Sequence, residues 1–149
     1  MVSRVFGTVA IAAVCLASGC SDTPTTPSAF SPYSQVDYRL GTGTEAVAGT
    51  TVTLNYTGWL YDPGRPDGKG VQFDTSVGVD PLKFTVGSGQ VIAGFDQGVT
   101  GMKIGGARRV TVPPSLGYGG VRNNSIPPYS TLVFDIDLID VTTPAGSGG

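Results

Sequence analysis

Residues 51–60, TVTLNYTGWL, alternate between polar and apolar side chains, and this alternation decides the fold. The apolar side chains on one face of this stretch are Val52, Leu54, Tyr56 and Leu60. The same period of two recurs near the end of the chain at Leu132, Phe134, Ile136 and Leu138, with Asp135 and Asp137 opposite. A period of two with one polar face is typical of antiparallel strands packed on one side. The two segments are therefore predicted to be strands of an antiparallel sheet.

A second type of periodicity occurs only once, between the shorter strand candidates 82–86 and 107–112. Its apolar positions, at helical spacing, are Ile92, Phe95, Val99 and Met102. The glycines at 94, 98 and 101 make this a weak autonomous helix, so packing must hold it in place. With further strand candidates at 36–40 and 71–75, the pattern predicts an α+β fold, a curved antiparallel sheet of five to six strands wrapped around one short α-helix.

Composition removes several classes of chemistry. The 149 residues include no histidine, which excludes a Ser-His-Asp triad, a Cys-His pair and any histidine-containing zinc site. The formal net charge is −2, and the only adjacent basic pair is Arg108–Arg109, so a nucleic-acid partner is disfavoured. We expect one of these arginines to be exposed and the other to lie at a strand edge. Asp135 and Asp137 are expected to form a solvated acidic surface.

The N-terminal residues have the pattern of an export signal. One arginine precedes an uncharged apolar run at 5–17, which is too short to span a bilayer comfortably. Residues 1–19 are therefore predicted to be a signal peptide. The following cysteine, in LASGC at 16–20, resembles a bacterial lipobox, which would make Cys20 the lipidated mature N-terminus. Cleavage by the ordinary signal peptidase near the same point is the alternative.

The rest of the chain divides into three parts by composition. Residues 20–34 are rich in Ser, Thr and Pro and are predicted to be a flexible tether. Residues 35–141 form the folded domain, and 142–149 form a flexible tail. The protein would then be exported and anchored in a membrane through its lipid, facing the periplasm or the cell exterior, and in the outer membrane if the organism is diderm.

Four segments together resemble a known family. They are TVTLNYTGWLYD (51–62), VQFDTSV (71–77), LKFTVGSGQVIAGFDQGVTGMKIGGARRVTVPPSLGYG (82–119) and IPPYSTLVFDIDLIDV (126–141). In order and spacing they are similar to FKBP-type peptidyl-prolyl cis–trans isomerases, and the resemblance covers about residues 35–141. It implies the FKBP-like fold and an enzyme that accelerates rotation about X–Pro bonds without a cofactor or a metal. The non-catalytic alternative is a Pro-peptide-binding module or holdase chaperone that uses the same pocket.

The resemblance also implies the residues of the site. The implied catalytic residues are Tyr56, Phe73, Asp74, Ile92 and Tyr118. The implied substrate-binding residues are Phe84, Val91, Phe95, Ile126 and Phe134. Phe95 replaces the tryptophan that is common at the pocket floor, and Leu82 stands where an aromatic residue is frequent. The implied partners are Pro-containing polypeptides and macrolides of the FK506 and rapamycin type, and a monomer is expected.

Overall fold

The computed structural model describes residues 31–146, so the predicted signal peptide, Cys20 and most of the predicted tether lie outside the described residues. The described chain forms six strands, one α-helix and one 3₁₀ helix. In chain order these elements are β1 (Ser34–Arg39), β2 (Thr51–Tyr61), β3 (Lys69–Thr75), β4 (Leu82–Thr85), α1 (Ala93–Val99), β5 (Ala107–Val112), η1 (Pro114–Leu116) and β6 (Leu132–Thr142). The predicted α+β architecture, a curved antiparallel sheet with one short helix, is confirmed.

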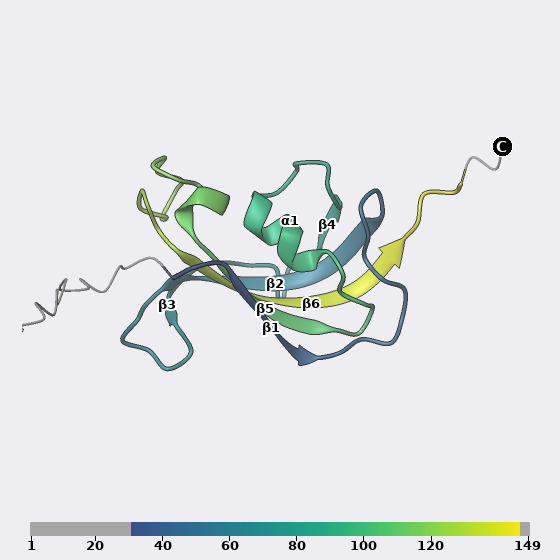
Figure 1. The fold of residues 1–149 in the computed structure, drawn as a ribbon, viewed down its shortest axis with the longest axis horizontal. Coiled ribbons are helices and arrows are strands. Elements are labelled where there is room, and N and C mark those ends of the chain that lie inside the picture. The colour runs from purple at the N-terminus through teal and green to yellow at the C-terminus, as the bar shows by residue number, and fades with distance from the viewer. Residues whose placement is uncertain (1–30, 147–149) are drawn as a thin grey trace, which may run out of the picture.

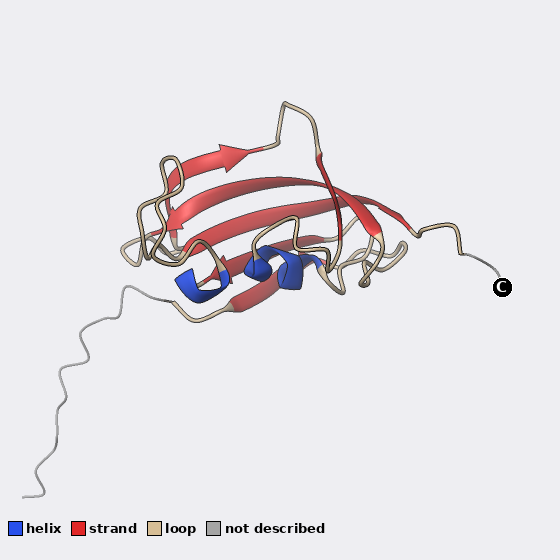
Figure 2. Cartoon of the chain, turned by 90° about the horizontal axis from the view of Figure 1, so that it is seen from above, coloured by secondary structure: helices blue, strands red, loops and turns tan. Residues whose placement is uncertain are grey.

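The two long strands form the centre of the sheet. The strand order is β1-β5-β6-β2-β3, and β4 also pairs with β2, beside β3 on the same edge. Every pairing is antiparallel, and β2 and β6 pair along their whole length, from Thr51 opposite Thr142 to Leu60 opposite Leu132. The alternating segments read from the sequence are therefore direct neighbours. The sheet curves, and α1 lies across one face of it (Figures 1 and 2).

The core fills the space between α1 and the sheet. The apolar faces of β2 and β6 are buried as the alternation predicts, and their fully enclosed side chains include Val52, Leu54 and Ile136. The helix contributes Phe95 and Val99, which are 3% and 0% exposed. α1 is shorter than the apolar stripe suggested, because Ile92 is its N-cap residue and the chain leaves helical geometry at Thr100.

Glycines allow the helix to sit directly on β5. A Cβ atom on Gly94 would collide with Val112, and one on Gly98 would lie 2.5 Å from Cγ2 of Val110. Helix–strand contact this close needs residues without a side chain, since real Cβ atoms do not approach other carbons to such distances. Two of the three glycines that weaken the isolated helix, Gly94 and Gly98, are therefore the ones that dock it.

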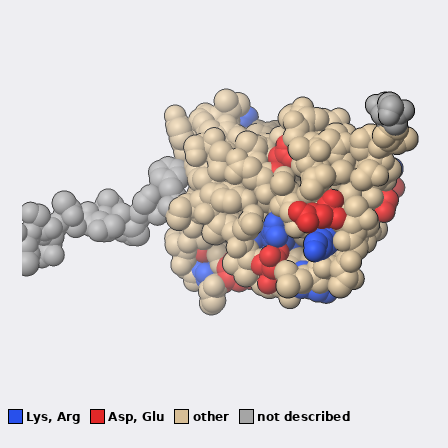
Figure 3. All heavy atoms as spheres, turned by 45° about the vertical axis from the view of Figure 1, so that its right-hand side comes forward, with Lys and Arg blue, Asp and Glu red and all other residues tan. Residues whose placement is uncertain are grey.

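The expectation for the adjacent arginines was wrong. β5 is an internal strand between β1 and β6, and its successive side chains point to opposite faces of the sheet. Arg108 faces the helix and is 7% exposed, while Arg109 lies on the outer face, where it pairs with Asp135. Neither arginine is a free surface cation. In the face drawn in Figure 3, acidic and basic side chains lie next to one another.

Asp135 also differs from the solvated carboxylate that was expected. Its oxygens lie 2.8 Å from Nε of Arg109 and 2.5 Å from Nζ of Lys69. Burial opposes ionisation of Asp135, but the hydrogen bonds from Arg109 and Lys69 outweigh it and lower the pKa of the carboxyl below its usual value. The carboxylate therefore joins β3, β5 and β6 on the outer face. Asp137, which pairs with Arg39, is 58% exposed and matches the expectation better.

Candidate functional site

A cavity of about 180 Å³ opens between the N-terminal end of α1 and the sheet. It is lined by Tyr56, Phe73, Asp74, Leu82, Gln90, Val91, Ile92, Phe95, Tyr118 and Phe134. These residues come from β2, β3, β4, β6, the start of α1 and the segment after η1. The curved sheet and the helix thus bring together side chains that are far apart in the sequence, around an opening that is mostly apolar.

Aromatic rings form the floor of this cavity, with Phe95 at their centre. The Phe95 ring lies 5.1 Å from that of Phe134, 5.6 Å from that of Tyr56 and 6.0 Å from that of Phe84. Phe73 meets Phe134 edge-to-face at 5.7 Å and 90°. Edge-to-face contacts of this kind fix ring orientations as well as exclude water. The cavity is consequently a preformed hydrophobic cup.

Gly58 explains how the rings of two strands come so close. It occupies an inward-facing position of β2, between Tyr56 and Leu60, where the alternation calls for an apolar side chain. A Cβ atom there would lie 2.6 Å from Phe73 and 2.9 Å from Phe134. The glycine in YTGWL therefore leaves the space into which these two rings pack.

One edge of the cavity is polar. The Tyr56 hydroxyl donates a hydrogen bond of 2.5 Å to Oδ2 of Asp74, and the backbone N–H of Thr75 donates to Oδ1 of the same carboxylate at 2.9 Å. Burial, the hydrogen bond to Asp74 and the negative charge of Asp74 raise the pKa of Tyr56 far above its ordinary value. Tyr56 is therefore a fixed donor, and it holds the Asp74 carboxylate at the cavity rim.

Two further donors at the rim have no protein acceptor among residues 31–146. The Ile92 N–H precedes the first turn of α1, whose own N–H groups at Phe95 and Asp96 both bond to the Ile92 carbonyl. Neither the Ile92 N–H nor the Tyr118 hydroxyl makes a hydrogen bond within that range. Because both residues line the cavity, they offer unused donors to a bound molecule with carbonyl oxygens.

A second cavity of about 190 Å³ shares three walls with the first, Phe73, Asp74 and Tyr118. Its other lining residues are Asn123, Asn124, Ser125 and Ile126, from the loop before β6. Asn124 adopts a left-handed conformation with φ of 47°, at the tip of a tight turn closed by the Asn123–Ile126 bridge. The site is thus an apolar cup continued by a more polar groove.

The structure brings most of the sequence-predicted residues to one place. Those that line the first cavity are Tyr56, Phe73, Asp74, Val91, Ile92, Phe95, Tyr118 and Phe134. Phe84 lies behind the floor and contacts Phe95, while Ile126 lines the second cavity and is 5% exposed.

Gln90 was missed by the sequence reading, although it lines the cavity just before Val91. Its side-chain oxygen accepts hydrogen bonds from the Thr85 N–H and the Ser88 hydroxyl, at 2.8 Å and 3.0 Å. Its place beside Val91 and Ile92 in the quoted motif was the available signal.

Within residues 31–146, no three His, Cys, Asp or Glu side chains gather in a way that could hold a metal ion. The same residues contain no helix long and apolar enough to cross a membrane.

Comparisons with known proteins agree with this geometry. Residues 42–139 match the model of the family described as FKBP-type peptidyl-prolyl cis-trans isomerase. The FK506-binding protein of Neisseria meningitidis serogroup B is 44% identical over 107 residues, which are 70% of this chain and 92% of that protein. The Arabidopsis thaliana protein named peptidyl-prolyl cis-trans isomerase FKBP15-3 is 44% identical over 99 residues, covering 66% of this chain and 65% of its own.

A solved structure supports the same relationship. The crystal structure of FkpA from Escherichia coli matches with a TM-score of 0.59 and 39% sequence identity. The match covers 74% of this chain and 47% of the FkpA chain, so the likeness extends over about half of that larger protein.

Proposed function

The chain belongs to the FKBP-type peptidyl-prolyl cis–trans isomerase family, and from this premise we propose that it accelerates X–Pro rotation in exported proteins by desolvating and twisting the amide in its aromatic cup. The observation that carries the proposal is the combination of a preformed apolar cavity with two unused donors at its rim, the Ile92 N–H and the Tyr118 hydroxyl.

The chemistry needs no bond breaking. Rotation about a peptide bond faces a barrier of about 18–20 kcal/mol, because the twisted amide loses its resonance. Water stabilises the planar, charge-separated amide more than the twisted one. A cup of phenyl rings removes that stabilisation, and walls shaped to the twisted proline bind the transition state more tightly than the ground state.

The polar groups orient the chain in this scheme. The Ile92 N–H and the Tyr118 hydroxyl donate to carbonyl oxygens that flank the proline, so that the ring enters the cup in one pose. Asp74 contributes its charge at the rim, where its carboxylate accepts hydrogen bonds from the Tyr56 hydroxyl and the Thr75 N–H, and rotation about the amide bond needs no base. Phe73, Phe95 and Phe134 supply the walls and the floor.

An isomerase assay on a short X–Pro peptide tests the proposal, with Phe73→Ala and Tyr118→Phe as the site variants. Both should lower kcat/KM by about tenfold while the variants stay folded, because Phe73 and Tyr118 are only half-buried. Tyr129→Phe is the matched control, because Tyr129 is 66% exposed and lines neither cavity.

The assay also separates the enzyme from a binding module or holdase with the same pocket. Peptide binding without a rate above the uncatalysed background would favour the binding module. Inhibition of the rate by an FK506-type macrolide, lost in Phe73→Ala, would place both ligands in the same cup. We expect the protein to act as a monomer, which size-exclusion chromatography with light scattering checks.

The proposed place of action rests on the sequence of the N-terminal segment. An apolar run at 5–17 followed by LASGC supports export and lipidation of Cys20, with residues 21–34 as a tether between a membrane and the domain. Mass spectrometry of the mature N-terminus decides the point. A diacylated or triacylated Cys20 supports the lipoprotein, and an unmodified Cys20 or a start beyond it refutes it. Membrane fractionation then tests whether the outer membrane holds the protein in a diderm host.

A further inference from the structure

Arg108 connects the far end of α1 to two strands of the sheet. Its Nη1 donates to the carbonyl of Gly98 at 2.9 Å and to that of Thr100 at 3.2 Å, and these are carbonyls of the last turn and C-cap of the helix. Its Nε and Nη2 donate to the two carboxylate oxygens of Asp37 in β1, at 2.6 Å and 3.2 Å. One buried guanidinium therefore joins β1, β5 and α1.

Close packing on β5 and the buried side chains of Phe95 and Val99 hold the helix against the sheet, but its own sequence provides little to fix its two ends. It is seven residues long, no side chain caps its N-terminus, and its last turn has no basic residue of its own. A helix this short is unstable alone, and the carbonyls at its C-terminal end need donors from elsewhere. Arg108 supplies a donor to two of them, the carbonyls of Gly98 and Thr100, and places a positive charge at the negative end of the helix dipole.

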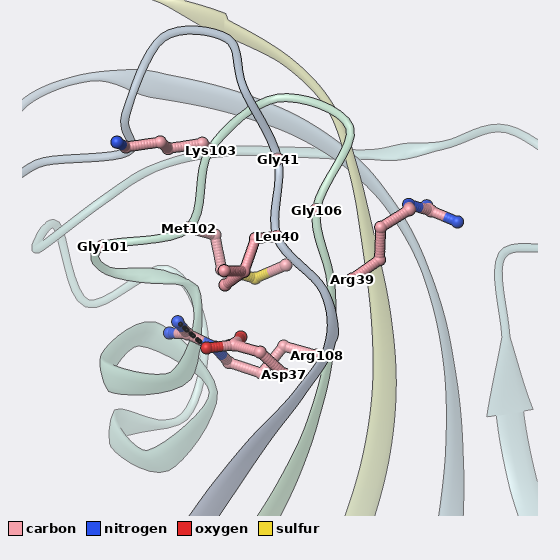
Figure 4. Close-up of a pocket in the computed structure, with 9 residues that line it drawn as sticks. All are labelled: Asp37, Arg39, Leu40, Gly41, Gly101, Met102, Lys103, Gly106 and Arg108. Atoms are coloured by element: carbon pink, nitrogen blue, oxygen red, sulfur yellow. Dashed lines mark hydrogen bonds and ion pairs between the residues drawn. The ribbon is translucent and has the colours of Figure 1, made fainter.

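Asp37 orients the guanidinium of Arg108 toward the helix. Asp37 and Arg108 face each other as a cross-strand pair of β1 and β5. In Figure 4 the two side chains meet beside α1 and are joined by a dashed line, while those of Arg39 and Lys103 lead away from them. The side-chain exposures are 8% for Arg108 and 34% for Asp37, so the cation is the buried partner and the carboxylate fixes its fork geometry.

The opposite end of the same helix builds the catalytic cup. Ile92 is the N-cap of α1 and Phe95 lies in its first turn, and both line the cavity. Seven residues of helix extend only about 10 Å and move as one body, so a tilt at Thr100 is also a tilt at Ile92. A displacement of about 1 Å at a reacting geometry is enough to cost a large factor in rate.

From these contacts we propose that Arg108, held by Asp37, is a positioning residue for the isomerase reaction. It fixes the position of α1 on the sheet, and thereby the positions of the Ile92 N–H and of the Phe95 ring at the floor of the cavity. The inference rests on the proposed roles of those two groups in catalysis. It assigns a function in the reaction to a buried ion pair that contacts neither cavity of the site.

A third cavity, of about 240 Å³, lies beside this ion pair, so the protein can tolerate a shorter side chain at position 108. Leu40 and Met102 extend into it close to each other, and Asp37 and Arg108 form another part of its wall (Figure 4). Because the cavity is polar along that wall, water can reach the carbonyls that a shorter side chain would leave bare. Arg108→Gln is therefore expected to fold.

The neighbouring arginine provides a matched control. Arg109 lies in the same strand and is paired with a carboxylate as Arg108 is, but it sits on the outer face and contacts Asp135 in place of the helix. Arg108→Gln and Arg109→Gln both remove one ion pair from β5. A merely structural role predicts that both lower Tm and leave kcat/KM of the folded protein unchanged. A positioning role predicts that Arg108→Gln alone lowers kcat/KM, by about tenfold.

The experiment measures Tm, kcat/KM at a temperature well below each Tm, and the ¹⁵N–¹H shift of the Ile92 amide. We expect Arg108→Gln to lower kcat/KM and to move the Ile92 resonance, and Arg109→Gln to do neither. Arg108→Lys keeps the charge but cannot hold Asp37 and both carbonyls at once, so its rate should fall between wild type and Arg108→Gln. It also serves as the test if Arg108→Gln fails to fold.

The inference would be overturned if Arg108→Gln, or Arg108→Lys where Arg108→Gln does not fold, kept the wild-type kcat/KM and left the Ile92 resonance unmoved. A wild-type protein without isomerase activity would contradict the proposed function instead. In that case the Ile92 shift still reports whether Arg108 fixes the position of the helix. Failure of the positioning role and failure of the proposed function are therefore distinguishable.

Discussion

The Tyr56 hydroxyl and the Asp74 carboxylate are joined by a 2.5 Å hydrogen bond from β2 to β3 at the rim of the aromatic cup. The bond fixes a negative charge next to the place where the proposed mechanism twists the amide. The same tyrosine ring forms part of the cup floor through its contact with Phe95. One residue thus shapes the apolar wall and orients Asp74, the only charged residue among 31–146 that lines this cavity.

Tyr56→Phe separates these two roles, since it keeps the ring and removes the donor. We expect kcat/KM for an X–Pro peptide to fall by about tenfold, the equivalent of about 1.4 kcal/mol, because the Asp74 carboxylate loses its fixed orientation. The pKa of Tyr56 is raised above its ordinary value of about 10, so the hydroxyl keeps its proton through pH 9 and the defect should be equal at pH 6 and pH 9. Tyr61→Phe, from the other face of β2, is the control, and a normal rate in Tyr56→Phe would refute the role.

The close approach of α1 to β5 yields a prediction about stability. Gly98→Ala would gain about 1 kcal/mol of helix propensity, but its Cβ would lie 2.5 Å from Val110, so we expect a net loss of about 1–3 kcal/mol from overpacking. The double variant Gly98→Ala/Val110→Ala should lose less than the sum of the two single losses, because the smaller partner makes room. Urea unfolding followed by the fluorescence of Trp59, the single tryptophan, measures each free energy. Strictly additive losses would show that the two residues do not compete for space.

The fold could be predicted from the sequence because its signals are local. Alternation along β2 and β6 identifies the paired central strands, and the spacing of Phe95 and Val99 identifies the helix face that they bury. The predicted limits of the four shorter strands differ from the observed ones by at most two residues, whereas β6 continues to Thr142, four residues beyond the last alternating position at Leu138. At β1 the register shifts between Asp37 and Arg39, an irregularity that apolar spacing does not reveal.

The ion pairs could not be predicted, since their partners are distant in sequence. Arg108 has the same parity as the buried Val110 and Val112, a signal that the expectation of one exposed arginine and one at a strand edge left unused. The sequence does not show that Asp37, 71 residues earlier, would accept its charge there. The site residues were reached through motif resemblance rather than periodicity, because a cavity wall and a core position have the same apolar pattern.

Phe95 is the residue on which the shape of the cup most depends, because its ring contacts those of Tyr56, Phe84 and Phe134. Phe95→Leu keeps an apolar side chain and removes the flat floor. We expect a loss of about 1–2 kcal/mol in the free energy of unfolding and a fall of about tenfold in kcat/KM. Leu132→Val, at a fully buried position of β6 outside both site cavities, is the control for core loosening. An equal fall in rate for both variants would mean that general packing matters and not the ring.

Asp135 links the stability of the outer face to pH. Its folded-state pKa is lowered, so the unfolded state binds its proton first as the pH falls, and the stability from its pairs with Lys69 and Arg109 is present above the unfolded pKa of about 3.9. That stability is lost as the pH falls through the folded-state value. At pH 7, Asp135→Asn should be about 1–2 kcal/mol less stable than wild type, because two half-buried cations lose their acceptor.

The two stability curves should therefore converge as the pH falls below the unfolded-state pKa of about 3.9, with the wild-type curve the steeper. Urea unfolding at several pH values, again followed by Trp59, measures them, and Trp59 is well placed because the Lys69 ammonium lies 4.0 Å from its ring centre. Asp137→Asn is the control, since its pair with Arg39 is exposed and such pairs contribute little. Parallel curves for wild type and Asp135→Asn would show that the carboxylate does not couple the outer face to pH.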